Sequence, residues 1–211
     1  MDIRIIKIGL LITAGQFLIS AGCRKASTPC IFGGYSFAVS SEWSPQNEIY
    51  NVGDTILLTS TFPKTLSDLV NPSLAIDYSN STGIGGSYIF YEFDTTQNKV
   101  KGAVAKLEFI PLIGVVNDGD IVPSEQKSIT YKESSSNYQF KLKVVLKSKG
   151  IFAIFISDLL SRGINGKNCT NAGFSNTLTN TNNNLNLFQY AMNRPPASQY
   201  EIDRIYCFRV Q

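Results

Sequence analysis

The feature that most constrains the fold of this chain is an alternation of apolar and polar residues with a period of two. It is clearest in the segment Tyr138–Lys147. Apolar residues occupy every second position there (Phe140, Leu142, Val144, Leu146), and three of the four residues that follow them are lysines (Lys141, Lys143, Lys147). Because successive side chains of a β-strand point to opposite faces, this pattern predicts a strand with one buried face.

Short strands are expected along most of the chain, separated by turns rich in Gly, Asn and Pro. The expected strands are Tyr35–Ser40, Ile49–Phe62, Leu74–Tyr78, Ser87–Asp94, Val100–Val116 with breaks at Pro111 and Gly114, Ser128–Glu133, Tyr138–Lys147, Ile151–Ile156 and Tyr200–Val210. The uninterrupted apolar run Ile151–Ile156 is typical of a central strand. Helical patterns are weak, with a turn or two expected at Lys64–Val70 and at Ser157–Ser161. We therefore expect an all-β fold, an antiparallel β-sandwich with one or two short helical turns.

Two short stretches lead into apolar strands in a recognisable way. Tyr50 is followed by the Gly53-Asp54 turn and Thr55, and Lys149-Gly150 precedes the apolar run. Both stretches resemble immunoglobulin-like modules of exported bacterial proteins, a likeness that covers two strands. The resemblance implies an immunoglobulin-like sandwich, and the length of the chain fits a single domain.

The N-terminus has the order of a secretory signal. Met1–Lys7 carries two basic residues, Ile8–Ile19 is apolar and uncharged, and small residues at 20–22 precede Cys23. The apolar run is too short to span a bilayer, which takes roughly 20 apolar residues. The small residues followed by a cysteine resemble the lipobox of bacterial lipoproteins, with Ser20 at the place where that motif usually has Leu. The resemblance implies cleavage before Cys23 and lipidation of its sulfur.

The chain then divides into a signal peptide (1–22), a polar tether (23–34) and the sandwich domain (35–211). Arg24 and Lys25 follow Cys23 where some surface-exported lipoproteins carry acidic residues. The Asp that often marks retention in the inner membrane is absent from that place. The resemblance therefore implies a protein anchored by its lipid to the bacterial outer membrane and facing the periplasm, with the cell surface as the alternative.

Charge and composition argue against several function classes. The chain has 19 basic and 16 acidic residues without a run of like charge, so a nucleic-acid partner is not expected. It has no His, which removes the Ser-His-Asp triad, the Cys-His pair and imidazole metal ligands. No dinucleotide or phosphate-binding motif occurs. We expect no enzymatic activity, no cofactor and no metal, and a hydrolase that uses carboxylates is the least favoured function.

Four cysteines stand at positions 23, 30, 169 and 207. If Cys23 is lipidated, three remain in an oxidising compartment, and one disulfide with one free thiol is the simplest arrangement. The sequence leaves all three pairings open, and we favour Cys169–Cys207.

Candidate ligand-binding residues are few, and each has a structural alternative. Asp118, Asp120 and Glu125 form an acidic cluster whose oxygens suit calcium, but an ordinary polar turn is the favoured interpretation. Trp43 follows the first strand and is a candidate sugar platform, against the more frequent role of a packed anchor.

Three longer segments also allow both a ligand-binding and a purely structural interpretation. The aromatic residues of Ser87–Asp94 could stack on sugars or bases, but core packing is favoured. The lysines near Tyr138–Lys147 could meet anionic lipid headgroups or an acidic partner, but protection of an edge strand is favoured. The Asn-rich segment 165–186 is expected to be a solvated loop with a weak strand at Phe174–Leu178, the alternative being a loop that faces a ligand.

The function favoured by these patterns is that of a membrane-tethered, non-catalytic β-sandwich lipoprotein that binds a protein or glycan of the cell envelope. The alternative is a structural or assembly lipoprotein without a small ligand.

Overall fold

The computed structural model describes residues 34–196 and 198–211, which belong to one compact unit. The expected signal peptide, Cys23 and nearly all of the tether lie outside the described residues. No helix among the described residues has the length and apolarity needed to cross a membrane. The strands are β1 (Tyr35–Ser44), β2 (Ile49–Tyr50), β3 (Thr55–Pro63), β4 (Thr65–Ser67), β5 (Ala75–Asp77), β6 (Gly85–Asp94), β7 (Lys99–Gly102), β8 (Leu107–Ile113), β9 (Val115–Asp118), β10 (Gln126–Thr130), β11 (Lys132–Glu133), β12 (Asn137–Leu146), β13 (Gly150–Ile156), β14 (Leu159–Ser161), β15 (Ala172–Leu178) and β16 (Ile205–Val210). The helices are η1 (Val104–Lys106), α2 (Leu185–Met192) and α3 (Gln199–Ile202).

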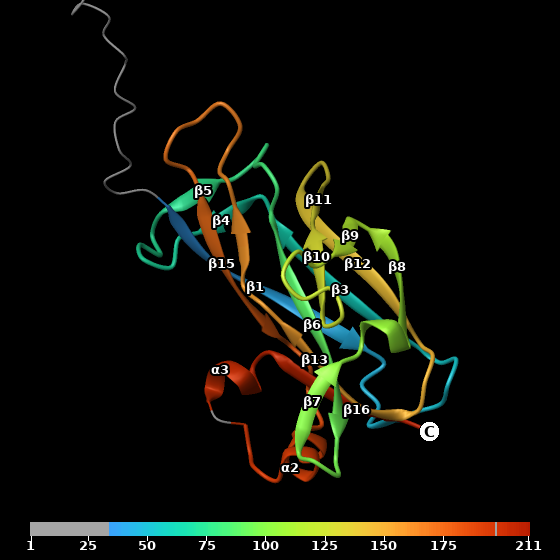
Figure 1. Cartoon of the computed structure of the whole chain (residues 1–211). Helices are drawn as coiled ribbons and strands as arrows, with labels where there is room; N and C mark the ends of the chain where they lie inside the picture. The colour runs from blue at the N-terminus through green and yellow to red at the C-terminus, as the bar shows by residue number, and fades with distance from the viewer. Residues whose placement is uncertain (1–33, 197) are drawn as a thin grey trace, which may run out of the picture. The chain divides into compact units, whose positions relative to one another are not determined.

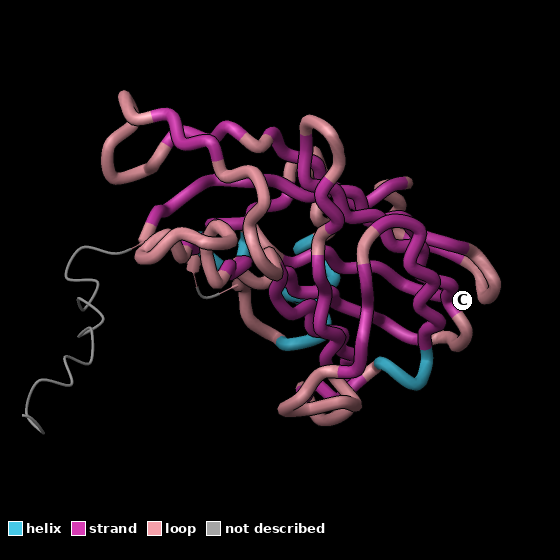
Figure 2. The backbone as a smooth tube through the Cα atoms, turned by 90° about the horizontal axis from the view of Figure 1, so that it is seen from above, coloured by secondary structure: helices cyan, strands magenta, loops and turns pink. Residues whose placement is uncertain are grey.

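The strands form two layers that share β1 (Figure 1). The first part of β1 pairs in parallel with β15, and its last part pairs antiparallel with β3. The long sheet continues from β15 through β14, β6, β13 and β16 to β2, with β7, β10 and β9 attached beside β6. The short sheet contains β3, β12, β8 and β11. Figure 2 shows that strands make up most of the tube and that the helices are a few small pieces.

Aromatic rings fill the space between the layers. Tyr88 of the long sheet meets Phe140 of the short sheet with ring centroids 6.0 Å apart. Phe62 and Phe174 make a similar contact across the layers at 5.6 Å. Along β12 every second residue is buried, as the period-two pattern predicts. The expected all-β, largely antiparallel sandwich is thus confirmed.

The run Ile151–Ile156 lies where a fully apolar strand was expected. It forms β13, which is hydrogen-bonded on both sides, to β6 and to β16.

Gly114 separates β8 from β9 with φ +87°, and a Cβ there would lie 2.5 Å from the Thr130 carbonyl oxygen and 2.8 Å from the Phe140 ring. Only glycine suits that turn. Pro111 does not break β8, because the ladder absorbs it in a register shift opposite Lys141 and Leu142.

The helical turns occur, but not where they were expected. Lys64–Val70 contains strand β4, paired with β5, and Ser157–Ser161 contains strand β14, paired with β15 and β6. The last strand begins at Ile205 rather than at Tyr200, because α3 precedes it. The Ser198 hydroxyl accepts a hydrogen bond from the Glu201 amide and caps α3.

Candidate binding pocket

The long sheet is apolar on both faces. In β6, Tyr88 and Phe90 point into the core, while Tyr91 and its neighbours at alternate positions point to the outer side. In β13, Ala153 and Phe155 belong to that outer side as well. Both strands therefore carry the long apolar runs of a sheet that is covered on two faces.

Helix α2 covers part of the outer face. Its Leu187, Phe188 and Ala191 are buried and form a second apolar cluster with residues of β6, β13 and β16. The Phe188 ring meets the Phe93 ring edge to face at 5.7 Å. The helix begins and ends at asparagines in the left-handed conformation, Asn184 and Asn193. Such residues break a helix cleanly, and they fix α2 at eight residues.

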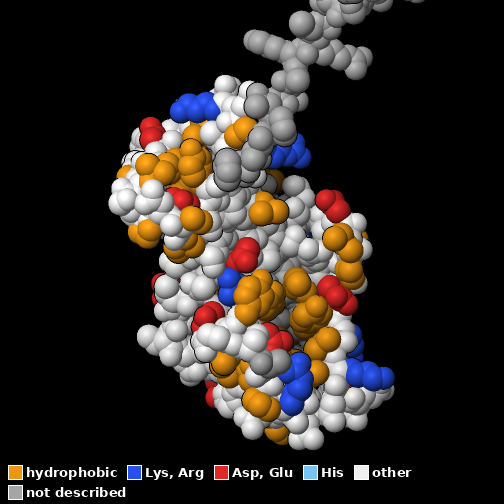
Figure 3. All heavy atoms as spheres, turned by 90° about the vertical axis from the view of Figure 1, so that its left-hand side faces the viewer, with side chains coloured by type: hydrophobic (Ala, Val, Ile, Leu, Met, Phe, Trp, Pro, Cys, Tyr) orange, Lys and Arg blue, Asp and Glu red, His pale blue; other side chains and the backbone are white. Residues whose placement is uncertain are grey.

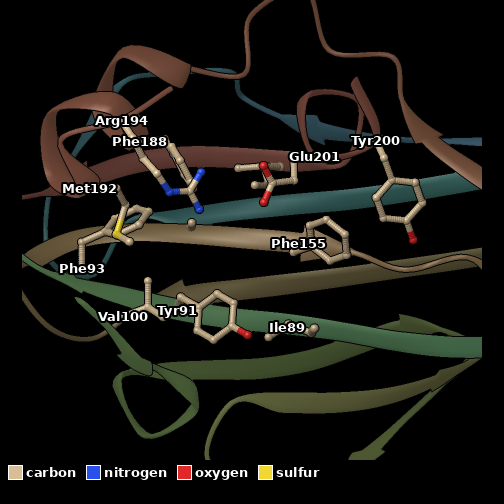
Figure 4. A pocket seen from close by; sticks show the side chains of 12 residues that line it. Ile89, Tyr91, Phe93, Val100, Phe155, Phe188, Met192, Arg194, Tyr200 and Glu201 are labelled. Carbon is tan, nitrogen blue, oxygen red and sulfur yellow. The ribbon is translucent and has the colours of Figure 1, made fainter. Parts of the chain in front are cut away.

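Because α2 and α3 are short, they leave a pocket of about 410 Å³ between them and the sheet. Its side chains come from β6, β7, β13, α2, α3, β16 and the α2–α3 connection (Figure 4). Ile89, Tyr91 and Phe155 line it from the sheet, Val100 from β7, and Phe188 and Met192 from α2. The interior of the pocket is therefore aromatic and aliphatic.

Polar groups stand beside this apolar interior. Figure 4 shows the side chains of Arg194 and Glu201 on the helical side of the pocket. The Arg194 guanidinium carbon lies 5.2 Å from the centroid of the Phe188 ring, and its Nη1 donates to the Pro195 carbonyl oxygen at 3.1 Å. This stacking holds a positive charge next to the apolar space.

Tyr200 of α3 is an aromatic lining residue that stays 47% exposed. Its ring lies 5.9 Å from the Phe155 ring, and the Arg204 guanidinium carbon lies 3.8 Å from its centroid. Arg204 in turn donates from Nη2 to Asp158 at 2.8 Å. Tyr200 is thus fixed by contacts on both sides, although nearly half of its surface faces solvent.

The described lining of the pocket carries few ionisable side chains. Among its described lining residues Glu201 is the single carboxylate, whereas glycoside hydrolysis by carboxylates takes two that flank the bond. On the sheet side, burial raises the pKa of Tyr91, with a smaller contribution from the charge of Glu125. Tyr91 therefore remains a neutral hydroxyl at physiological pH.

Of the acidic residues predicted as ligands, none is among the described lining residues of this pocket, and Glu125 adds only the smaller contribution, after burial, to the raised pKa of Tyr91. Asp118 is exposed and forms an ion pair with the Lys127 ammonium at 2.5 Å, and Asp120 is exposed in the turn. Within residues 34–196 and 198–211, no group of three or more His, Cys, Asp or Glu side chains is arranged to hold a metal ion. The three carboxylates are not gathered into a calcium site.

Trp43 is fully buried, so its assignment as an exposed sugar platform is wrong. Its ring stacks on Tyr206 with centroids 6.3 Å apart and planes at 14°. Strand β1 extends to Ser44, which carries Trp43 into the core as the packed anchor that was the favoured alternative.

The predicted Cys169–Cys207 pairing is also wrong. Cys207 is a free, fully buried thiol on the outer face of β16, in the cluster beneath α2, and burial raises its pKa. Cys169 lies in the loop before β15 and is disulfide-bonded. The two remaining cysteines, Cys23 and Cys30, lie outside the described residues.

Two further interpretations change. β12 is hydrogen-bonded to β3 on one side and to β8 on the other, so its lysines do not protect an edge. In the Asn-rich segment 165–186 the expected strand at Phe174–Leu178 is present, as β15, but the segment also holds the start of α2 and is more ordered than a solvated loop. Its asparagines hold the end of β1 and the loop after it: the Asn180 side chain accepts from the Trp43 amide at 3.0 Å, and the Asn184 side-chain amide donates to the Asn47 carbonyl oxygen at 3.1 Å.

The pocket residues of α2 and α3 were missed, although a signal was present. Apolar residues at 185, 187, 188, 191 and 192 have helical spacing. The aromatic segment Ser87–Asp94 was assigned to the core, which holds for one of its faces only.

No family model matches this chain, and no curated protein matches it. Structural likenesses are distant. The cohesin module of a family 33 glycoside hydrolase from Clostridium perfringens is 10% identical, with a TM-score of 0.32 over 66% of this chain and 98% of that one. The second type II cohesin module of the adaptor ScaA scaffoldin from Acetivibrio cellulolyticus is 9% identical, with a TM-score of 0.33 over 69% and 94%. Scores this low carry no argument about function.

Proposed function

We propose that this protein is a non-catalytic binding module, tethered to the membrane through Cys23, whose pocket receives an apolar side chain of a partner protein. The observation that supports it is the pocket of about 410 Å³ on the outer face of the long sheet. An incompletely covered apolar pocket beside a few polar groups is the usual form of a binding site.

The composition of the pocket favours a protein over a glycan. Ile89, Val100 and Met192 offer no hydrogen bonds to sugar hydroxyls, and Phe155 is partly covered by Tyr200 rather than presented as a flat platform. Arg194 and Glu201 bring opposite charges to one side of the pocket, as in the polar rim of a protein interface. An aromatic or branched aliphatic side chain would fill the apolar interior, and polar groups of the partner on either side of it would meet Arg194 and Glu201.

The test is a selection of displayed random peptides on the purified full-length protein. Enriched peptides are expected to share an aromatic or branched aliphatic residue. Phe155→Ser is expected to weaken their binding at least about tenfold, equivalent to about 1.4 kcal/mol. Leu160→Ser is the matched control, because Leu160 is 69% exposed on β14 and does not line this pocket.

A glycan panel run on the same protein gives the competing result. Glycan binding that Phe155→Ser abolishes, together with no enriched peptide, would overturn the protein partner and keep the pocket. Peptide binding that Phe155→Ser leaves unchanged would place the site elsewhere.

A further inference from the structure

The loop between β4 and β5 presents apolar side chains to solvent. Val70 is 84% exposed, Leu69 is 50% exposed and Leu74 is 43% exposed. Figure 3 shows hydrophobic side chains gathered on the upper part of the molecule, at the height of β4 and β5 in Figure 1. Large apolar residues grouped in one exposed loop are a mark of an interaction surface.

Hydrogen bonds fix the shape of this loop. The Asp68 carboxylate is largely buried and accepts from the Ser36 amide at 2.9 Å and from the Asn71 amide at 3.1 Å. The Asp68 amide donates to the Leu74 carbonyl oxygen at 3.1 Å and closes the loop. The apolar side chains are therefore held outward by an ordered backbone, and they do not fold back onto the domain.

The loop lies where the described chain begins. The Leu69 amide donates to the Ser36 carbonyl oxygen at 2.6 Å, and Ser36 is the second residue of β1. Residues 1–33 join the domain beside it, and among them are the apolar run Ile8–Ile19 and Cys23. Even when fully extended, residues 23–34 reach no further than about 40 Å, so a lipid on Cys23 keeps this end of the domain close to the bilayer.

We propose that Leu69, Val70 and Leu74 enter the interfacial layer of the membrane that holds Cys23, as a second contact. This rests on the proposed tether. A lipid bilayer is the occupant because the tether leaves the domain at this loop and not at the pocket. Figure 1 places β4 and β5 at one end of the domain and α2 and α3 at the other. With the loop in the membrane, the end of the domain that carries α2, α3 and the pocket lies away from the bilayer.

The contact supplies orientation, whereas the lipid supplies attachment. A lipid chain alone leaves a domain free to turn on its tether, and a second apolar insertion restricts that freedom. Exposed Lys167 lies in the loop before β15, and hydrogen bonds tie this loop to the residues that follow β5: the Tyr78 hydroxyl donates to the Thr170 carbonyl oxygen at 2.7 Å, and the Asn165 amide donates to the Asn80 carbonyl oxygen at 2.9 Å. The Lys167 ammonium therefore sits at the same end, where phosphate headgroups would meet it.

The test uses the lipidated full-length protein in liposomes of phosphatidylethanolamine and phosphatidylglycerol. A Val70→Cys variant is labelled with the fluorophore NBD, with the unsubstituted protein as the blank for labelling of other thiols. Tyr190→Cys is the matched control, since Tyr190 is 66% exposed on α2. At position 70 the emission is expected to shift to shorter wavelength and to be quenched by nitroxide lipids, whereas at position 190 it is expected to stay as in water.

The added substitutions Leu69→Ser and Leu74→Ser are expected to reduce the shift at position 70. Protein that floats with the liposomes but shows the same emission at 70 and 190 would overturn the second contact and leave the tether intact. Protein that does not float at all would overturn the tether and the contact together. A Cys23→Ser variant that floats like the parent would overturn the tether alone, and the contact would then rest on the NBD shift.

Discussion

The two faces of strand β13 are built from similar residues and do different things. Phe152, Ile154 and Ile156 face the other sheet and are fully buried. Phe155 faces outward, where α2 and α3 leave it half-buried in the pocket. The inner face is closed by a whole sheet, while the outer face is closed by two short helices. The difference teaches that the same apolar sequence supplies stability where its cover is complete and a binding surface where its cover is partial.

The largest expected effect is the difference in stability loss between a substitution on the inner face of β13 and one on its outer face. Phe152→Ala is expected to lower the free energy of unfolding by about 3–5 kcal/mol, because it opens a cavity in the closed core. Phe155→Ala, on the same strand, is expected to cost less than about 1.5 kcal/mol, since solvent already reaches the side chain. Urea unfolding curves of both variants measure the contrast.

Lys147→Ala serves as the surface control and is expected to change little. Equal losses for Phe152→Ala and Phe155→Ala would show that the outer cover is as complete as the inner one.

The second effect appears at alkaline pH. Burial raises the pKa of Tyr88 and Tyr206 between the sheets above the ordinary 10.0, and that of Cys207 under α2 above 9.0. The unfolded chain then loses these protons at lower pH than the native protein does. Their stabilising contribution is full below about pH 9 and falls as pH rises, by about 1.4 kcal/mol per pH unit for each group ionised only in the unfolded state.

Urea unfolding between pH 7 and pH 11 tests this prediction. It also separates the contribution of Cys207, on the outer face of the long sheet, from that of the tyrosines between the sheets. Cys207→Ala is expected to delay the onset of the loss to the range where tyrosines titrate. An alkaline profile that is flat in the parent protein would contradict the burial of these groups.

The smallest effect concerns β6. The Tyr88 hydroxyl is fully buried near the side chains of Tyr131, Ser41 and Asn176, and none of them meets it with ordinary hydrogen-bond geometry in the described structure, so Tyr88→Phe removes a poorly satisfied group. It is expected to be neutral or to stabilise by up to about 1 kcal/mol. Tyr91→Phe, on the outer face, is expected to leave the thermal midpoint unchanged. Thermal unfolding followed by circular dichroism measures both, and a clear loss for Tyr88→Phe would indicate that its hydroxyl is paired.

The fold was predictable because local patterns carry it. The alternation in Tyr138–Lys147 and the apolar run Ile151–Ile156 are properties of neighbouring residues, and both became the strands they indicated. The predictions that proved wrong, for Trp43 and Cys207, depend on three-dimensional contacts that the local pattern does not contain. Trp43 is buried because β1 runs further than its alternation showed, and Cys207 lies as a free thiol in the apolar cluster beneath α2, a helix that was not expected.

The pocket could not be derived from the sequence for the same reason. Its lining joins residues 89–100, 153–155 and 188–205, and no spacing along the chain connects them. A strand that is apolar on both faces looks alike whether a helix covers it fully, partly or not at all. Incomplete cover is a property of the length of α2, which the two asparagines at its ends decide.

The shared strand β1 also has a mechanical meaning. Seven of its residues pair in parallel with β15, from Tyr35 through Ser41, and the next three pair with β3 in the other sheet. A force that pulls the chain at Gly34 along the strand loads these rungs in shear, so that they share the load and do not open one after another. If the domain is held at this point and pulled by a bound partner at its far end, the hydrogen bonds of β1 to both sheets would have to break together. The domain would then resist unfolding under tension.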